Sequence, residues 1–162
     1  MSDPYEETLQ GETTLRLPPG PRHELICARL HALLQASTAD FSGTRLNPIR
    51  AVVTLANETI LRPDLSLVTA ATGKLWLAVE VVSSDDHRVD TVLKKEIYES
   101  VKLARLWMVD PRYDNIEVYH ASQFGLVLKG ILAGNEVLTE SLLPEFQITV
   151  GELFRAGAAA TG

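Results

Sequence analysis

The longest apolar run in this chain is LWLAVEVV, residues 75–82. Almost every position is apolar, so both faces of a strand formed here are hydrophobic, as in a central strand that is covered on both sides. Glu80 is the exception, and by the two-residue period of a strand its face also holds Trp76 and Ala78. An ionised carboxylate in a covered strand is costly unless a cation pairs with it. The stretch therefore predicts a central strand that carries a chemically important glutamate.

Helices and strands are expected to alternate around this central strand. The apolar periodicity predicts helices over residues 22–36 and 88–102. The other expected elements are strands over residues 50–55, 65–68, 106–109 and 115–119, and a hairpin over 125–138 with Gly134 and Asn135 in its turn. The predicted fold class is α/β, with a mixed β-sheet flanked by helices and additional β-hairpins.

The chain is long enough for one domain with a sizeable core, because it has 162 residues of which 46% are hydrophobic. We expect residues 1–20 to form an N-terminal arm, loose and polar over residues 1–14. The domain itself is expected over residues 21–155, and residues 156–162 are expected to form a disordered tail. No linker or internal repeat divides the sequence.

Charge and cysteine content narrow the class of protein. The formal net charge is −6, which argues against a tight, non-specific nucleic-acid binder, since such binding depends on clustered Lys and Arg. Carboxylates that hold divalent cations also make a chain acidic, so a nuclease stays possible. The sequence contains one cysteine, Cys27, which is expected to be a small buried hydrophobe. No signal peptide or membrane span is evident, and a cytoplasmic location is expected.

Three side chains are expected to meet at one edge of the sheet. Asp64 follows Pro63 at the mouth of the strand next to Glu80, and two facing carboxylates repel unless a cation lies between them. Mg²⁺ or Mn²⁺ suits such an all-oxygen site. On the following helix, Lys94 lies at the border of the apolar stripe and can reach toward Glu80, whereas Lys95 is expected in solvent. The residues therefore predict a metal site with a nearby amine.

These residues, in this order, resemble the Uma family of restriction-endonuclease-like proteins, which belongs to the PD-(D/E)XK nuclease superfamily. The resemblance extends from about residue 21 to residue 154. The motifs that carry it are Arg62-Pro63-Asp64, Val79-Glu80-Val81, Asp90 with Lys94 and Tyr98, and LWMVDP at residues 106–111. It implies a restriction-endonuclease-like core and hydrolysis of DNA phosphodiester bonds at a divalent metal.

The resemblance also implies roles for individual residues. Asp64 and Glu80 would bind Mg²⁺ or Mn²⁺ with the backbone carbonyl of Val81, and Lys94 would orient the attacking water or stabilise charge in the transition state. In the wider superfamily a lysine lies two residues after the glutamate, where this chain has Val82. His23 matches the family's histidine at the start of the first helix and is a further catalytic candidate.

Other interpretations of the same residues remain open. Glu80 could form a buried salt bridge with Lys94, and Asp64 could cap a strand entry. The chain could then be a non-catalytic binding or assembly module of the same fold, or it could hydrolyse a small phosphodiester. A homodimer would let two copies span both strands of a duplex, although no residue demonstrates it.

Overall fold

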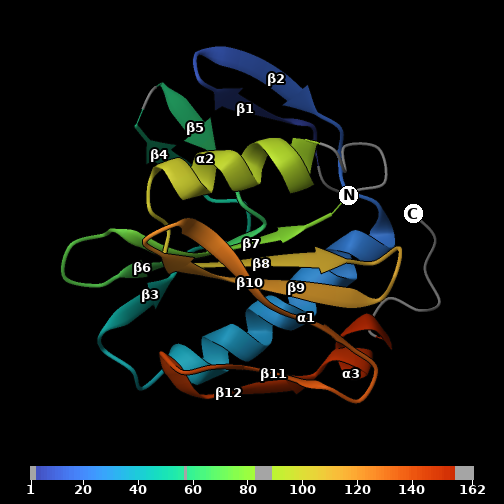
Figure 1. Cartoon of the computed structure of the whole chain (residues 1–162). Coiled ribbons are helices and arrows are strands. Elements are labelled where there is room, and N and C mark those ends of the chain that lie inside the picture. The colour runs from blue at the N-terminus through green and yellow to red at the C-terminus, as the bar shows by residue number, and fades with distance from the viewer. Residues whose placement is uncertain (1–2, 57, 83–88, 156–162) are drawn as a thin grey trace.

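The computed structural model describes residues 3–56, 58–82 and 89–155. Within them a six-stranded sheet forms the centre of the molecule (Figure 1). Its strands, in spatial order, are β10 (Gly125–Ala133), β9 (Asn115–Ser122), β8 (Arg105–Asp110), β7 (Leu75–Val81), β6 (Leu65–Thr69) and β3 (Thr44–Leu46). β7 pairs with β8 in parallel, and the other pairs are antiparallel. The predicted mixed sheet is confirmed, with residues 75–81 in its interior.

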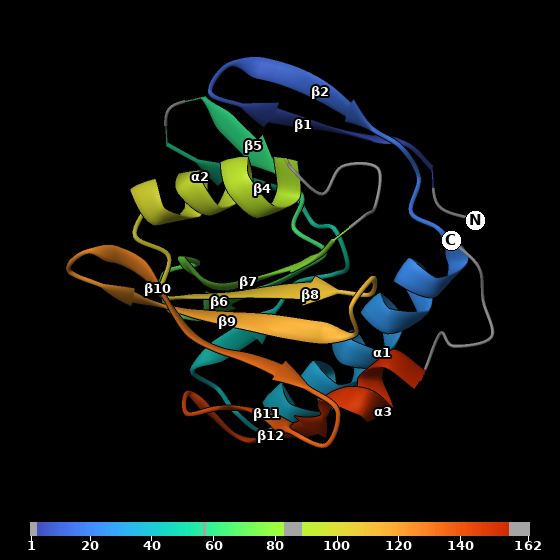
Figure 2. The same cartoon turned by 45° about the vertical axis from the view of Figure 1, so that its right-hand side comes forward.

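One face of this sheet is covered by helices and a hairpin. Helix α1 (Pro21–Thr38) crosses it, together with α3 (Val150–Arg155) and the hairpin of β11 (Val137–Glu140) and β12 (Leu143–Thr149) (Figure 2). Proline at the first position suits the start of α1. The first core lies between these layers and includes Ile26, Leu30, Leu77, Val79, Trp107, Phe146 and Leu153.

The opposite face carries helix α2 (Lys94–Ser100), which follows a π-helical turn, η1 (Val89–Leu93). Above α2 lies a four-stranded sheet in the order β2 (Glu12–Arg16), β1 (Tyr5–Leu9), β5 (Thr59–Leu61) and β4 (Val53–Leu55) (Figure 1). The second core lies on this face and includes Leu9, Leu61, Ala78, Ile97, Tyr98, Leu106 and Met108. Glu80, two positions after Ala78, lies on the same face as this core.

The N-terminal segment differs from the prediction. Residues 5–9 and 12–16 form the antiparallel pair β1–β2, and β1 also pairs with β5. The expectation of a loose arm is therefore wrong for these residues. Their polar composition concealed the strands, because only one side of the hairpin, with Glu7, Leu9 and Arg16, is buried.

Two further expectations are wrong. The hairpin predicted over residues 125–138 does not form, since β10 pairs with β9 and β11 pairs with β12. Gly134, between β10 and β11, has a left-handed φ of 58°.

Trp76 packs against the first core and does not share the face of Glu80. An irregularity in the β6–β7 register, where Val68 pairs with Leu75 directly after Leu67 pairs with Leu77, breaks the alternation there. The predicted tail, residues 156–162, lies outside the described residues.

Candidate active site

Asp64 lies at the start of β6 and accepts hydrogen bonds from three directions. Its Oδ1 accepts from Arg50 Nη1 at 2.9 Å and from His23 Nε2 at 3.1 Å, while Oδ2 accepts from the backbone N–H of Val81 at 2.8 Å. Burial acts to raise the pKa of Asp64, but His23, the Val81 N–H and Arg50 together hold that pKa below the ordinary value. Asp64 is therefore a buried carboxylate that its surroundings keep ionised.

Glu80 projects from β7 toward helix α2, where two side chains meet it. Lys94 Nζ lies 3.2 Å from Oε2, and the hydroxyl of Tyr98 donates to Oε1 at 2.7 Å. Lys94 and Tyr98 are four residues apart, so they lie on one side of the helix. The predicted approach of Lys94 to Glu80 is confirmed. Lys95, by contrast, is partly exposed and lies beside Glu99 at the surface.

Sequence reasoning missed a third carboxylate, that of Glu7. Its Oε1 lies 2.9 Å from Lys94 Nζ and 2.9 Å from Arg16 Nε, and its Oε2 accepts from the backbone N–H of Arg62 at 2.8 Å. Lys94 is therefore held between Glu7 and Glu80. A predicted strand over residues 5–9 would have placed Glu7 on the same face as Leu9 by the two-residue period, and this signal could have found it.

Arg50 is another residue that the sequence did not single out. It has a left-handed φ of 54° and directs its guanidinium to Asp64 and to Glu24. Its Nη1 also lies 4.0 Å from the sulfur of Cys27, and Cys27 is buried as predicted. Burial raises the pKa of the Cys27 thiol well above its ordinary value. Arg50 thus supplies the positive charge beside Asp64, much as Lys94 does beside Glu80.

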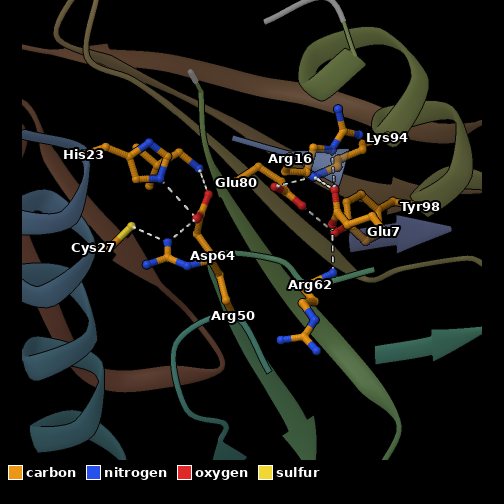
Figure 3. Close-up of polar contacts among 11 residues, drawn as sticks. Glu7, Arg16, His23, Cys27, Arg50, Arg62, Asp64, Glu80, Lys94 and Tyr98 are labelled. Carbon is orange, nitrogen blue, oxygen red and sulfur yellow. Dashed lines mark hydrogen bonds and ion pairs between the residues drawn. The ribbon is translucent and has the colours of Figure 1, made fainter. Parts of the chain in front are cut away.

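The two clusters form one electrostatic site at the end of β7. Burial raises the pKa of Tyr98, and Glu80, Glu7 and Asp64 raise it further, so carboxylates of both clusters act on this one hydroxyl. Figure 3 shows the two groups of side chains. His23, Cys27 and Arg50 surround Asp64, whereas Glu7, Arg16, Lys94 and Tyr98 lie around Glu80.

The donor set fits a hard divalent cation. Asp64 and Glu80 supply buried carboxylate oxygens from neighbouring strands, and oxygen is the ligand that Mg²⁺ and Mn²⁺ prefer. A carboxylate offers about four acceptor sites, of which Asp64 uses three on His23, Arg50 and the Val81 N–H. A cation bound by Asp64 therefore has to share the carboxylate with these donors.

The mixed sheet is covered by helices, and its neighbouring strands β6 and β7 bring two buried carboxylates to one end of the sheet, with a lysine of helix α2 beside Glu80. This arrangement places the protein in the restriction-endonuclease-like α/β class. The chain belongs to the Uma2 family: the family model, described as "Putative restriction endonuclease", matches residues 2–151. This confirms the resemblance seen in the sequence and extends it to include the N-terminal hairpin.

A solved structure shows the same fold. The crystal structure of "a putative nuclease belonging to DUF820" from Anabaena variabilis ATCC 29413 matches with a TM-score of 0.80 and 15% sequence identity, over 96% of this chain and 92% of that chain. A search of the curated proteins found no match. Among the described residues, no helix is both long and apolar enough to span a membrane.

Proposed function

We propose that this protein is a metal-dependent endonuclease that hydrolyses DNA phosphodiester bonds. The observation that carries the proposal is a pair of buried carboxylates, Asp64 directly before β6 and Glu80 on the neighbouring strand β7 with the amine of Lys94 beside it, in a chain of the Uma2 family. Two carboxylates and an amine in this arrangement supply what phosphodiester hydrolysis needs, namely ligands for a divalent cation and a positive charge close to it.

Each side chain takes a defined role in the proposal. Asp64 and Glu80, with the backbone carbonyl of Val81, would hold Mg²⁺ or Mn²⁺; when bound, such an ion lowers the pKa of a coordinated water and offsets phosphate charge. His23 and Arg50 orient Asp64, and the hydroxyl of Tyr98 orients Glu80.

Lys94 is the proposed catalytic amine. Its Nζ lies between the carboxylates of Glu7 and Glu80, which fix its position beside the proposed metal ligands. From there the amine can donate to the attacking water or to a phosphate oxygen on which negative charge develops.

The test is DNA cleavage by the wild type and by Glu80→Gln, which keeps the volume of the side chain and removes its charge. With plasmid or single-stranded DNA and Mg²⁺ or Mn²⁺, we expect the variant to lose more than about a hundredfold in rate, since even outer-shell changes at metal sites cost up to about that much. Glu96→Gln, the same substitution at an exposed position of helix α2, is the matched control. Undiminished cleavage by Glu80→Gln would refute the assignment.

One observation favours a second candidate, a non-catalytic binding or assembly module. Asp64 and Glu80 are already paired with Arg50 and Lys94, so the fold can accommodate both carboxylates through protein cations alone. Calorimetry separates the two candidates. Binding of Mg²⁺ or Mn²⁺ at millimolar concentration that is lost in Asp64→Asn supports the nuclease, and the absence of binding in the wild type supports the module.

The proposal also includes a partner, a compartment and an oligomeric state. DNA is the proposed partner and the cytoplasm the proposed compartment, and a homodimer would let two sites act on the two strands of a duplex. Analytical ultracentrifugation with and without a DNA duplex measures the oligomeric state, and a monomer under both conditions would remove the dimer from the proposal.

A further inference from the structure

A second set of potential metal ligands lies on the other side of Asp64. One ligand atom each from His23, Cys27 and Asp64 lies within 4.8 Å of the others, and His23 Nε2 is 3.1 Å from Asp64 Oδ1. All three side chains are buried, with 8%, 0% and 3% of their respective residue surfaces exposed. His23 and Cys27 are four residues apart in α1, so one side of the helix presents both to Asp64.

We infer that His23, Cys27 and Asp64 form a binding site for a thiophilic divalent cation such as Zn²⁺ or Co²⁺. A nitrogen, a sulfur and an oxygen ligand favour these ions over Mg²⁺, which prefers oxygen alone. Around a tetrahedral ion with Zn–N of about 2.0 Å and Zn–S of about 2.3 Å, ligand atoms lie roughly 3–4 Å apart. The three atoms are therefore close to the required spacing, and small side-chain movements complete it.

The charges of the neighbouring groups favour such an ion. Counted together, ionised Asp64 and Glu24 with Arg50 carry a net charge of −1, and the Cys27 thiol adds none. When Cys27 binds the divalent ion as a thiolate, its proton leaves to solvent and the net charge of the group becomes zero. Arg50 Nη1 contacts both Asp64 Oδ1 and Cys27 Sγ, so the ion has to displace this nitrogen from both atoms, while Nη2 can stay paired with Glu24.

This site is separate in chemistry from the proposed nuclease centre but shares Asp64 with it. Occupation by Zn²⁺ or Co²⁺ would engage the Asp64 carboxylate on the side of α1, away from Glu80. The inference does not rest on the proposed nuclease activity, because binding of the ion can be measured without DNA.

Titration of the full-length protein with Co²⁺, followed by absorption spectroscopy, tests the site. Cys27 is the only cysteine, so any sulfur-to-cobalt charge-transfer band must come from it. We expect the wild type to show this band together with the visible bands of four-coordinate Co²⁺, and Zn²⁺ to abolish them by displacement. The charge-transfer band should be absent in Cys27→Ala, and His23→Ala should bind Co²⁺ about tenfold or more weakly.

Glu80→Gln distinguishes this inference from the proposed function. Glu80 is not among the three ligands, so this variant should keep the cobalt bands while losing Mg²⁺-dependent cleavage. Thermal unfolding of each variant reports whether the fold is intact. A wild type without the charge-transfer band at millimolar Co²⁺, or an unchanged affinity in a folded His23→Ala variant, would overturn the inference whatever the nuclease assay shows.

Discussion

At the scale of single residues, the site gives a cationic partner to each of three buried carboxylates. Arg50 faces Asp64, Lys94 faces Glu80, and Glu7 contacts both Lys94 and Arg16. Transfer of an unpaired charge into a protein interior costs several kcal/mol, so these pairs depend on one another. Such a network stays intact only while every member keeps its partner.

Glu7 tests this dependence. Glu7→Gln should lower the free energy of unfolding by about 2–4 kcal/mol, because it leaves buried cationic groups with a neutral partner. Urea denaturation measures the change. Glu6→Gln is the matched control, since Glu6 is the exposed neighbour on the same strand and should shift stability by less than about 0.5 kcal/mol. Equal effects of the two substitutions would contradict the assigned role of Glu7.

Asp64 gives a prediction about pH. Its folded-state pKa lies below the ordinary value of 3.8, so the unfolded chain takes up the proton first as the pH falls. The carboxylate therefore contributes stability above about pH 4, and this contribution disappears as the pH drops through the lowered pKa. Between pH 6 and pH 3, stability measured in urea should fall less steeply in Asp64→Asn than in the wild type. A parallel fall in the two proteins would contradict the role of His23 and Arg50.

At the scale of elements, helix α2 positions both partners of Glu80. The π-helical turn η1 precedes it directly, and turns of this kind are frequent at functional sites. The spacing of Lys94 and Tyr98 then brings the amine and the hydroxyl to the two oxygens of one carboxylate. The side of α2 that faces β7 is therefore part of the site.

The end of α2 contains a strained residue. Lys102 adopts a left-handed φ of 59°, and the N–H of Leu103 donates to the carbonyl of Tyr98, which closes the helix. Lys102→Gly should raise the free energy of unfolding by about 0.5–1 kcal/mol, because glycine adopts this conformation without a Cβ clash. Lys102→Ala keeps the Cβ and is the control in the same denaturation experiment, where an equal gain would point to charge and not to backbone strain.

At the scale of the whole molecule, the N-terminal hairpin joins the second core to the site. Leu9 belongs to the second core, while Glu7 of the same strand contacts Lys94. The hairpin is thus connected to the second core by an apolar contact and to helix α2 by an ionic one. Figure 2 shows the hairpin on the same side of the central sheet as α2. It is expected to unfold together with the sheet in a single transition.

This cooperativity can be measured through the tryptophans, because Trp76 and Trp107 both lie with the first core, on the other face of the sheet. Leu9→Ala should cost about 2–3 kcal/mol and shift the tryptophan fluorescence transition and the circular dichroism transition equally. Leu15→Ala, at a residue that is 63% exposed on the partner strand, should shift neither. Separate transitions in Leu9→Ala would show that the hairpin unfolds alone.

The site residues that lie in a regularly patterned strand or helix could be predicted from the sequence. The apolar run of residues 75–82 predicted a central strand and singled out Glu80, and the angular position of Lys94 on its helix predicted the contact between them. Glu7 and Arg50 were not predictable in this way. Glu7 belongs to a hairpin whose polar sequence resembles a loose arm. Arg50 itself adopts a left-handed φ in a turn, and the sequence pattern does not show where its side chain points.

The mixed α/β class, the central strand and the family resemblance could all be predicted from the sequence, because each is carried by short motifs of residues near one another in the chain. The partners of the buried charges came from the three-dimensional arrangement: Glu7 lies between Arg16 and Lys94, Arg50 contacts Asp64, and His23 and Cys27 of α1 lie close to Asp64. Side-chain periodicity shows which face of a helix or strand is buried, and it depends only on neighbouring residues. The partner of a buried charge depends instead on strand pairing and packing between segments that are far apart in the sequence.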